Sequence, residues 1–305
     1  MSAVSGKFDV RDMAEVKDFI GIKVKRDRKA STITLSNPGH TAALLQAFGM
    51  EMATPNKTTM ASGVKLAKTG KDLLPAGARY AAPVGSLLYL STMTRPDISF
   101  AVGVLSRFMS CPEQDNMRAA KGVLRYLRGT TRLGVAYGSS DPMQGYVDVD
   151  WAGDVDGRRS TTGFICTVNG ASIAWASNRH STAATSIAEA EYVAAAMATK
   201  EALWLRTLLG VLGVDGQAVP MGEDIQSCLA LIYNPEATGR TKHVDVAYHM
   251  VRDYQTLKDV AFYFLLSAKR PADGLTKPLP SPAFTAFRDE IGVGPALVGA
   301  DTAQW

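Results

Sequence analysis

The apolar positions of the first 140 residues predict a few short strands followed by helices. Alternating apolar and polar residues favour strands, and apolar residues three and four apart favour helices. These patterns predict strands at 19–24 and 32–35 and helices at 41–48, 84–93, 96–109 and 113–127. Between them, residues 54–77 are polar with scattered Pro and Gly, which is typical of a surface loop. This part of the chain should therefore be mostly helical.

The second half changes to a mixed order of strands and helices. The predicted strands are 144–149, 163–168, 171–176, 219–225 and 260–266, and the predicted helices are 187–212, 227–233, 244–257 and a short one after Pro271. Asn169-Gly170 indicates a hairpin turn between the second and third strands. Ser186 to Glu189 fits a capping box at the start of the long helix. This order predicts an α/β fold with a mixed sheet.

A cluster of turn residues at 137–145 predicts a boundary between the two patterns. We therefore divide the chain into residues 1–140, residues 141–280 and a C-terminal tail, 281–305.

The formal charge changes sign at this boundary. Residues 1–140 hold 20 Lys and Arg against 10 Asp and Glu, and residues 141–305 hold 13 against 19, so the net charges are +10 and −6. A basic part suits a polyanion such as nucleic acid, and an acidic part that acts on the same polyanion needs bridging cations.

One predicted helix concentrates positive charge. Its four cations are spaced by three, four and three residues and so share one face: Arg118, Lys121, Arg125 and Arg128. Phosphate binding and a merely solvated helix face both fit this pattern. Further candidate phosphate contacts are Arg158, Arg159 and Lys242.

Four acids occupy separate predicted elements of the second half: Asp148, Glu191, Asp224 and Asp273. If the fold brings them together, their like charges require a counter-charge. Divalent Mg²⁺ prefers oxygen ligands, and a pair of such ions can support displacement at a phosphodiester. Any acidic domain has acids at such spacings, so the spacing alone does not establish a metal site. The residues around the acids provide a more specific criterion.

Ordered motifs run through both halves of the chain. The second half contains YVDVDWAGDVDGRRSTTGF (146–164), EAEY (189–192), EALWLR (201–206), RTKHVDVAYH (240–249) and ADGLTKPLP (272–280), and the first half contains VKDFIGIKVKRDR (16–28), YAAPVGSLLYL (80–90), TRPDISFAVGVLSRFMSCP (94–112) and VLRYLRGT (123–130). In this order they resemble the C-terminal part of the Pol polyprotein of copia-type retrotransposons. The matches extend over roughly residues 16–280.

The resemblance implies a fold and an activity. The implied fold is a ribonuclease H-like domain, with a mixed five-stranded sheet and flanking helices, preceded by a smaller, mostly helical remnant of the reverse transcriptase thumb or connection. The implied activity is metal-dependent endonucleolytic cleavage of the RNA strand of RNA–DNA hybrids. Its implied ligand set for two Mg²⁺ ions, with Mn²⁺ as a substitute, is Asp148, Glu191, Asp224 and Asp273. Glu191 is preferred over Glu189 because residues two apart on a helix cannot face one site.

The other candidate residues have auxiliary or structural roles. Asp150 shares the strand face of Asp148 and is a candidate auxiliary residue, as is His243. Both His243 and His249 also fit purely structural roles. Asp154 and Asp156 are expected in a solvated turn. Trp151, Trp175 and Trp204 are expected in the core, and Cys111, Cys166 and Cys228 are expected to be buried apolar residues.

Some residues depart from the family pattern. Where that pattern has Cys-Asp-Asn-Gln-Ser, this chain has Glu223-Asp224-Ile225-Gln226-Ser227, and Gly274 follows Asp273 where an apolar residue is usual. Gly274 could loosen the terminal helix. These departures favour the alternative function, a decayed or domesticated fragment that binds nucleic acid without catalysis.

The remaining expectations concern the setting of the protein. The Asp-Asp signature of the polymerase is absent, so we expect no polymerisation by this chain. Neither a membrane segment nor a secretion signal is recognisable, so we expect an intracellular protein, in the cytoplasmic virus-like particle of the element or in the nucleus. Its expected partners are the RNA–DNA hybrid and, if present, the upstream reverse transcriptase segment.

Overall fold

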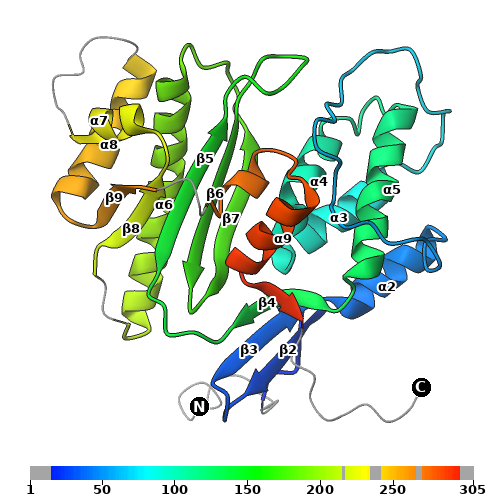
Figure 1. Ribbon diagram of the computed structural model, residues 1–305, viewed down its shortest axis with the longest axis horizontal. Helices are drawn as coiled ribbons and strands as arrows, with labels where there is room; N and C mark the ends of the chain where they lie inside the picture. The colour runs from blue at the N-terminus through cyan, green and yellow to red at the C-terminus, as the bar shows by residue number, and fades with distance from the viewer. Residues whose placement is uncertain (1–14, 215–216, 234–241, 266–269, 296–305) are drawn as a thin grey trace, which may run out of the picture.

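The computed structural model describes residues 15–214, 217–233, 242–265 and 270–295, and the side chains of 242–248 lie outside that description. The described chain is α/β, with two five-stranded sheets (Figure 1). Its strands and helices start and end within a few residues of the predicted ones in most cases. None of the helices in the described ranges combines the length and apolar character that crossing a bilayer requires.

The larger sheet belongs to the second half of the chain. Its order is β7-β6-β5-β8-β9, formed by Ala171–Arg179, Thr161–Val168, Gln144–Asp150, Val219–Glu223 and Val260–Phe264. Strands β5 and β7 are each antiparallel to β6, whereas β8 and β9 run parallel to β5. Asn169 and Gly170 both have positive φ, 50° and 80°, as the two-residue turn between β6 and β7 requires. The predicted hairpin is therefore confirmed, and the mixed five-stranded sheet is the ribonuclease H-like arrangement that the motifs imply.

Helices pack against this sheet. They are α6 (Ile187–Val211), α7 (Gln226–Tyr233), α8 (Lys242–Thr256) and the short helix η2 (Asp273–Leu275). The long helix α6 packs against β5 and β6, and α8 packs against α6. The α6 N-terminus has half of the predicted capping box: Ser186 Oγ accepts the Glu189 N–H at 3.2 Å, but the Glu189 carboxylate accepts the Thr185 N–H, at 2.7 Å.

The smaller sheet is built mainly by the first half. Its order is β1-β2-β3-β4-β10, formed by Asp18–Phe19, Ile22–Asp27, Thr32–Ser36, Leu133–Tyr137 and Val293–Pro295. Helices dominate the rest of this half: α2 (Pro38–Ala47), α3 (Ala81–Met93), η1 (Pro96–Ile98), α4 (Ser99–Ser106) and α5 (Gln114–Gly129). The mostly helical first part is confirmed. The strand pairing of β4 with β3 and β10 was not predicted.

The last described segment returns to the first half of the chain. Residues 281–295 form α9 (Ser281–Glu290) and β10, and Figure 1 shows α9 between the larger sheet and helices α3 to α5. Phe284 lies edge-on to Tyr126 of α5, with ring centroids 5.4 Å apart. Phe284, Phe287, Ile291 and Val293 are all buried in the same core as Leu105 and Leu127. This part of the expected tail is thus an integral packing element, while the division into domains stays a prediction.

Strand β6 links two hydrophobic cores. Its first seven residues are all buried, which means that both of its faces are covered. Ile165 belongs to the core of the first half, whereas Phe164 and Cys166 belong to the core beneath α6. Successive side chains of a strand point to opposite faces, so one strand serves both cores. This shared packing fixes the larger sheet against the first half.

Two of the three tryptophans that were expected in the core are exposed. Trp151 is 41% exposed in the turn that follows β5, and Trp204 is 57% exposed on α6. Trp175 is half-buried and its Nε1 donates to Ser91 O at 2.7 Å, which ties β7 to α3. Of the cysteines, Cys166 and Cys228 are buried as expected, whereas Cys111 is exposed.

Candidate functional site

The four predicted acids converge at one end of the larger sheet. Asp148 lies on β5, Glu191 lies in the second turn of α6, Asp224 directly follows β8, and Asp273 begins η2. The parallel pairing of β5 with β8 sets Tyr146 opposite Gly222, and continuing this register brings Asp148 level with Asp224. Asp148 and Glu191 are buried, with 6% and 1% of their surface exposed.

A lysine joins two of these acids. Lys277 Nζ lies 3.1 Å from Asp273 Oδ2 and 3.8 Å from Asp148 Oδ2. Next to it, Thr276 Oγ1 donates a hydrogen bond to Asp148 Oδ2. Burial alone would lower the pKa of Lys277, but the two carboxylates raise it, so its ammonium group stays charged between them. Thr276 and Lys277 were not singled out in the sequence, although both stand in the ADGLTKPLP motif.

A second cation, Arg270, compensates the charge of Asp224. Arg270 Nη1 pairs with Asp224 Oδ2 at 2.9 Å. The other oxygen of Asp224 is buried without a hydrogen-bond partner. Burial and the nearby Asp148 raise the pKa of Asp224, and the two cations, Arg270 and Lys277, work against this increase.

A fifth acid, Glu223, was missed by the sequence analysis. It is fully buried at the end of β8, and ligand oxygens of Glu191, Glu223 and Asp224 all lie within 4.8 Å of one another. Neighbouring residues of a strand face opposite sides. If the predicted strand 219–225 had continued through Asp224, the side chain of Glu223 would point away from the site. The strand in fact ends at Glu223, and the chain beyond turns so that both side chains reach the same place.

The electrostatics of the centre favour cation binding. Burial, and then the charges of Glu223, Asp148 and Asp224, raise the pKa of Glu191. Burial and Asp148 likewise raise the pKa of Asp273. Within the described part of the chain, four of the acids have one buried oxygen without a hydrogen-bond partner: Glu191, Glu223, Asp224 and Asp273. Buried carboxylate oxygens are normally satisfied, and hard divalent cations take oxygen ligands, so these residues fit a metal.

Three further acids lie at the end of β5 and in the loop between β5 and β6. Asp150 is half-buried, and burial raises its pKa, with a further increase from Asp148. Asp154 is not a solvated turn residue as expected, because it is 6% exposed and pairs with Arg179 at 2.9 Å and with Arg107 at 3.5 Å. Those two arginines supply the charge that permits its burial. Asp156 is exposed and accepts the Lys68 N–H at 3.0 Å.

The structure also places the residues predicted to contact nucleic acid. The four cations of α5 are all exposed on one side of the helix: Arg118, Lys121, Arg125 and Arg128. Arg118 pairs with Asp115 at one end of this set. Arg158 is exposed and Arg159 is half-buried in the loop after β5. The side chains of Lys242 and His243 lie outside the described residues, and His249 is exposed. A role in binding remains a prediction for all of them.

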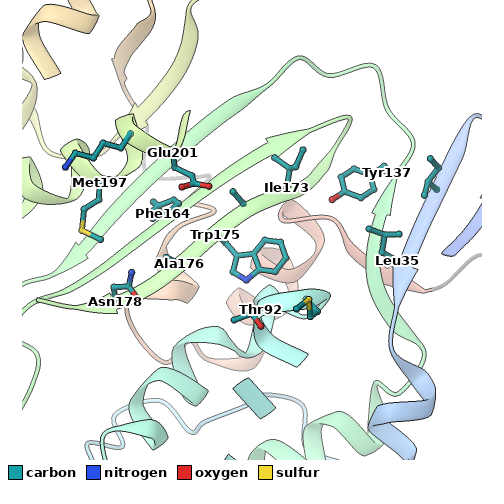
Figure 2. Close-up of a pocket in the computed structure, with 14 residues that line it drawn as sticks. Leu35, Thr92, Tyr137, Phe164, Ile173, Trp175, Ala176, Asn178, Met197 and Glu201 are labelled. Carbon is teal, nitrogen blue, oxygen red and sulfur yellow. The ribbon is translucent and has the colours of Figure 1, made fainter. Parts of the chain in front are cut away.

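A separate groove lies away from the acids. It has a volume of about 980 Å³ and runs beside β7, between α6 and the smaller sheet. Figure 2 shows Trp175, Ile173, Leu35 and Met197 around it. Its lining is largely apolar and includes none of the five clustered acids, so the catalytic chemistry is not placed there.

Comparison with known proteins supplies the family. No family model matches the chain. It is 37% identical over 95% of its length to the "Retrovirus-related Pol polyprotein from transposon TNT 1-94" of Nicotiana tabacum. It is 36% identical over 96% of its length to the corresponding polyprotein from transposon RE2 of Arabidopsis thaliana. The chain belongs to the copia-type retrotransposon Pol family.

The chain spans about a fifth of these relatives, 22% of the first and 20% of the second. Among solved structures, it is similar to LC11-RNase H1, isolated from compost, at 15% identity over 44% of this chain and 92% of that chain, with a TM-score of 0.34. That score is too low to support the fold assignment. The ribonuclease H-like fold of this Pol segment rests on the strand order and directions of its larger sheet.

Proposed function

We propose that this Pol segment cleaves the RNA strand of RNA–DNA hybrids in a reaction that depends on divalent metal. One observation carries the proposal. Carboxylates from four separate segments, Asp148, Glu191, Asp224 and Asp273, meet at one end of the sheet. Among the described residues, Glu191, Asp224 and Asp273 each keep one buried oxygen that has no hydrogen-bond partner.

The ligand set for the metal is this group of four acids. When bound there, a pair of Mg²⁺ or Mn²⁺ ions would supply charge to stabilise both the attacking and the leaving oxygen of a phosphodiester hydrolysis. In that hydrolysis, water adds at the phosphorus and the 3′-oxygen of the RNA leaves. Thr276 and Lys277 orient Asp148, by a hydrogen bond and by charge, so that one of its oxygens keeps a fixed direction.

The exposed cations of α5 give the substrate a second point of contact. Positive side chains bind the phosphate backbone without reading its sequence. An RNA–DNA hybrid fits a site that combines such backbone contacts with selection of the strand that carries 2′-hydroxyls. The basic part and the acidic centre would then act on one polyanion, with the metal ions between acid and phosphate.

The decisive experiment compares the wild type with Asp148→Asn on a labelled hybrid in Mg²⁺ or Mn²⁺. The amide keeps the size of the side chain but removes its charge, so we expect cleavage to fall by about 100-fold or more, roughly 2.7 kcal/mol in the barrier. Asp253→Asn, at an exposed position on α8, is the matched control and should cleave normally. A wild-type protein that leaves the hybrid intact with both metals would refute the proposal.

The alternative of a binding fragment without catalysis gives a different pattern in the same assay. It requires hybrid binding that persists in EDTA, weakens with salt and is unaffected by Asp148→Asn, with no products. Gly274 gives this alternative little support. A Cβ at Gly274 would lie 2.5 Å from the Phe287 ring, so glycine is what lets α9 pack against η2.

A further inference from the structure

Glu223 is a buried acid whose two oxygens are in different situations. Its exposed fraction is 0%, and Oε1 accepts the Ile225 N–H at 3.2 Å. Oε2 is buried and has no hydrogen-bond partner among the residues that the structure describes. A carboxylate enclosed in this way costs several kcal/mol unless a cation or hydrogen bonds compensate it. The Ile225 N–H and a hydrogen bond with the Cys228 side chain compensate this charge only in part.

The neighbours of Glu223 make this cost larger. Within the described residues, the centre holds the five acids Asp148, Glu191, Glu223, Asp224 and Asp273 against the two cations Arg270 and Lys277. Fully ionised, this set has a net charge of −3, five negative against two positive. Both cations contact other acids: Arg270 contacts Asp224, and Lys277 contacts Asp148 and Asp273. A divalent ion would compensate the charges of Glu223 and Glu191, and without one their burial favours the protonated, neutral forms.

The arrangement of oxygens fits a ligand role. Glu191 Oε2 is also buried without a partner, and so is Asp224 Oδ1. Ligand atoms of Glu191, Glu223 and Asp224 lie within 4.8 Å of one another, a spacing that a single ion can bridge at oxygen-to-metal distances of about 2.0 to 2.6 Å.

We propose that Glu223 is a fifth carboxylate ligand of the centre and binds one divalent ion together with Glu191 and Asp224. The inference rests on the proposed metal-dependent function but concerns a residue outside its four-acid set. Three carboxylates on one ion replace more of its water than the one or two that Mg²⁺ commonly accepts. Glu223 adds a further negative charge beside the ion, so it should tighten binding of the ion without contacting the substrate.

Direct metal titration tests this role without relying on catalysis. The full chain is titrated with Mn²⁺, and the electron paramagnetic resonance signal of the free ion reports the bound fraction. Glu223→Gln keeps the shape of the side chain and removes its charge, and we expect at least about a tenfold weaker affinity at one of the Mn²⁺ sites. Glu189→Gln is the matched control, because Glu189 is on the same helix as Glu191 but binds Thr185. It should bind Mn²⁺ as the wild type does.

Thermal unfolding in EDTA separates a ligand from a structural residue. If Glu223 serves the metal, Glu223→Gln should unfold in EDTA at the wild-type temperature or above it, and should gain less than the wild type when Mn²⁺ is added. Wild-type Mn²⁺ affinity in Glu223→Gln, with weakened affinity in Asp148→Asn, would overturn the inference and leave the nuclease proposal standing. Should Glu223→Gln not fold, Glu223→Asp retains the charge and must bind Mn²⁺ more tightly than Glu223→Ala.

Failure of the nuclease proposal would give a different result from failure of the inference about Glu223. In that case the wild type binds Mn²⁺ and loses affinity on Glu223→Gln, but the hybrid stays uncut. A protein that binds no Mn²⁺ at all would overturn both proposals.

Discussion

At the scale of single residues, the TRPD motif has a structural function. Arg95 and Asp97 form a bidentate pair at 2.9 and 2.8 Å, and both are buried, with 1% of each residue exposed. Arg95 also donates to Thr130 O at 3.0 Å, and the Tyr126 hydroxyl donates to Asp97 at 2.5 Å. This fully bonded network ties η1 to the end of α5. It explains one of the strongest family motifs without assigning it to catalysis.

Removing one charge from this network should be costly. We expect Asp97→Asn to lower the free energy of unfolding by about 3–5 kcal/mol, because it leaves the Arg95 charge buried and uncompensated. Urea unfolding followed by circular dichroism measures the change. Asp115→Asn breaks the exposed pair with Arg118 and should cost less than about 1 kcal/mol. Equal losses in the two variants would show that burial does not determine the strength of these pairs.

At the scale of elements, α5 shows how one helix performs two tasks. One side is buried and apolar, with Val123, Leu124 and Leu127 in the core. The start of the helix is fixed by Glu113 and Asn116, whose side chains each accept a backbone N–H of the other. The cations occupy the opposite, exposed side. Because the apolar side holds the helix in place, the charged side is free to serve a ligand.

Neutralising that side should weaken hybrid binding. We expect the triple change Arg118→Gln, Lys121→Gln and Arg125→Gln to lower affinity and to reduce the slope of log K against log salt by up to about 2 to 3. Fluorescence anisotropy at several salt concentrations measures both quantities. The control triple Lys17→Gln, Arg26→Gln and Lys29→Gln removes three exposed charges elsewhere and should leave the slope nearly unchanged. Equal effects of the two triples would show that the overall charge of the protein, and not the position of the cations on α5, determines hybrid binding.

At the scale of the whole molecule, the C-terminal segment holds the two halves together. Strand β10 pairs with β4 of the smaller sheet, and Ser172 on β7 of the larger sheet donates from Oγ to Ile291 O at 2.6 Å. Helix α9 buries Phe284 and Phe287 beside α5 and η2. The η2 helix begins with Asp273, so packing against α9 also supports the position of this acid.

A truncation of one side chain tests this packing. We expect Phe287→Ala to cost about 3–5 kcal/mol of unfolding free energy, since it removes a buried ring that contacts Gly274. Thr285→Ala, on the exposed side of the same helix, should change stability by less than about 0.5 kcal/mol. Differential scanning calorimetry provides the comparison. A neutral effect of Phe287→Ala would restore the original expectation that residues 281–305 are only a tail.

The sequence by itself determined the local structure and the order of the elements. Asn169-Gly170 specifies its turn because both residues accept positive φ, and the spacing of Arg118, Lys121 and Arg125 specifies one face of a helix. The ordered motifs indicated the mixed sheet and, through the family, the four acids. These features depend on neighbours in the chain, so a sequence pattern can express them.

Only the tertiary structure decided how distant segments combine. Strands β4 and β10 pair although the chain between them contains the entire larger sheet, and no local pattern records such a partner. Asp154 is buried because Arg107 and Arg179 arrive from other elements. Glu223 joins Glu191 and Asp224 because β8 ends where it does. Burial and electrostatic compensation depend on what packs around a residue, and that is set by the three-dimensional arrangement of the whole chain.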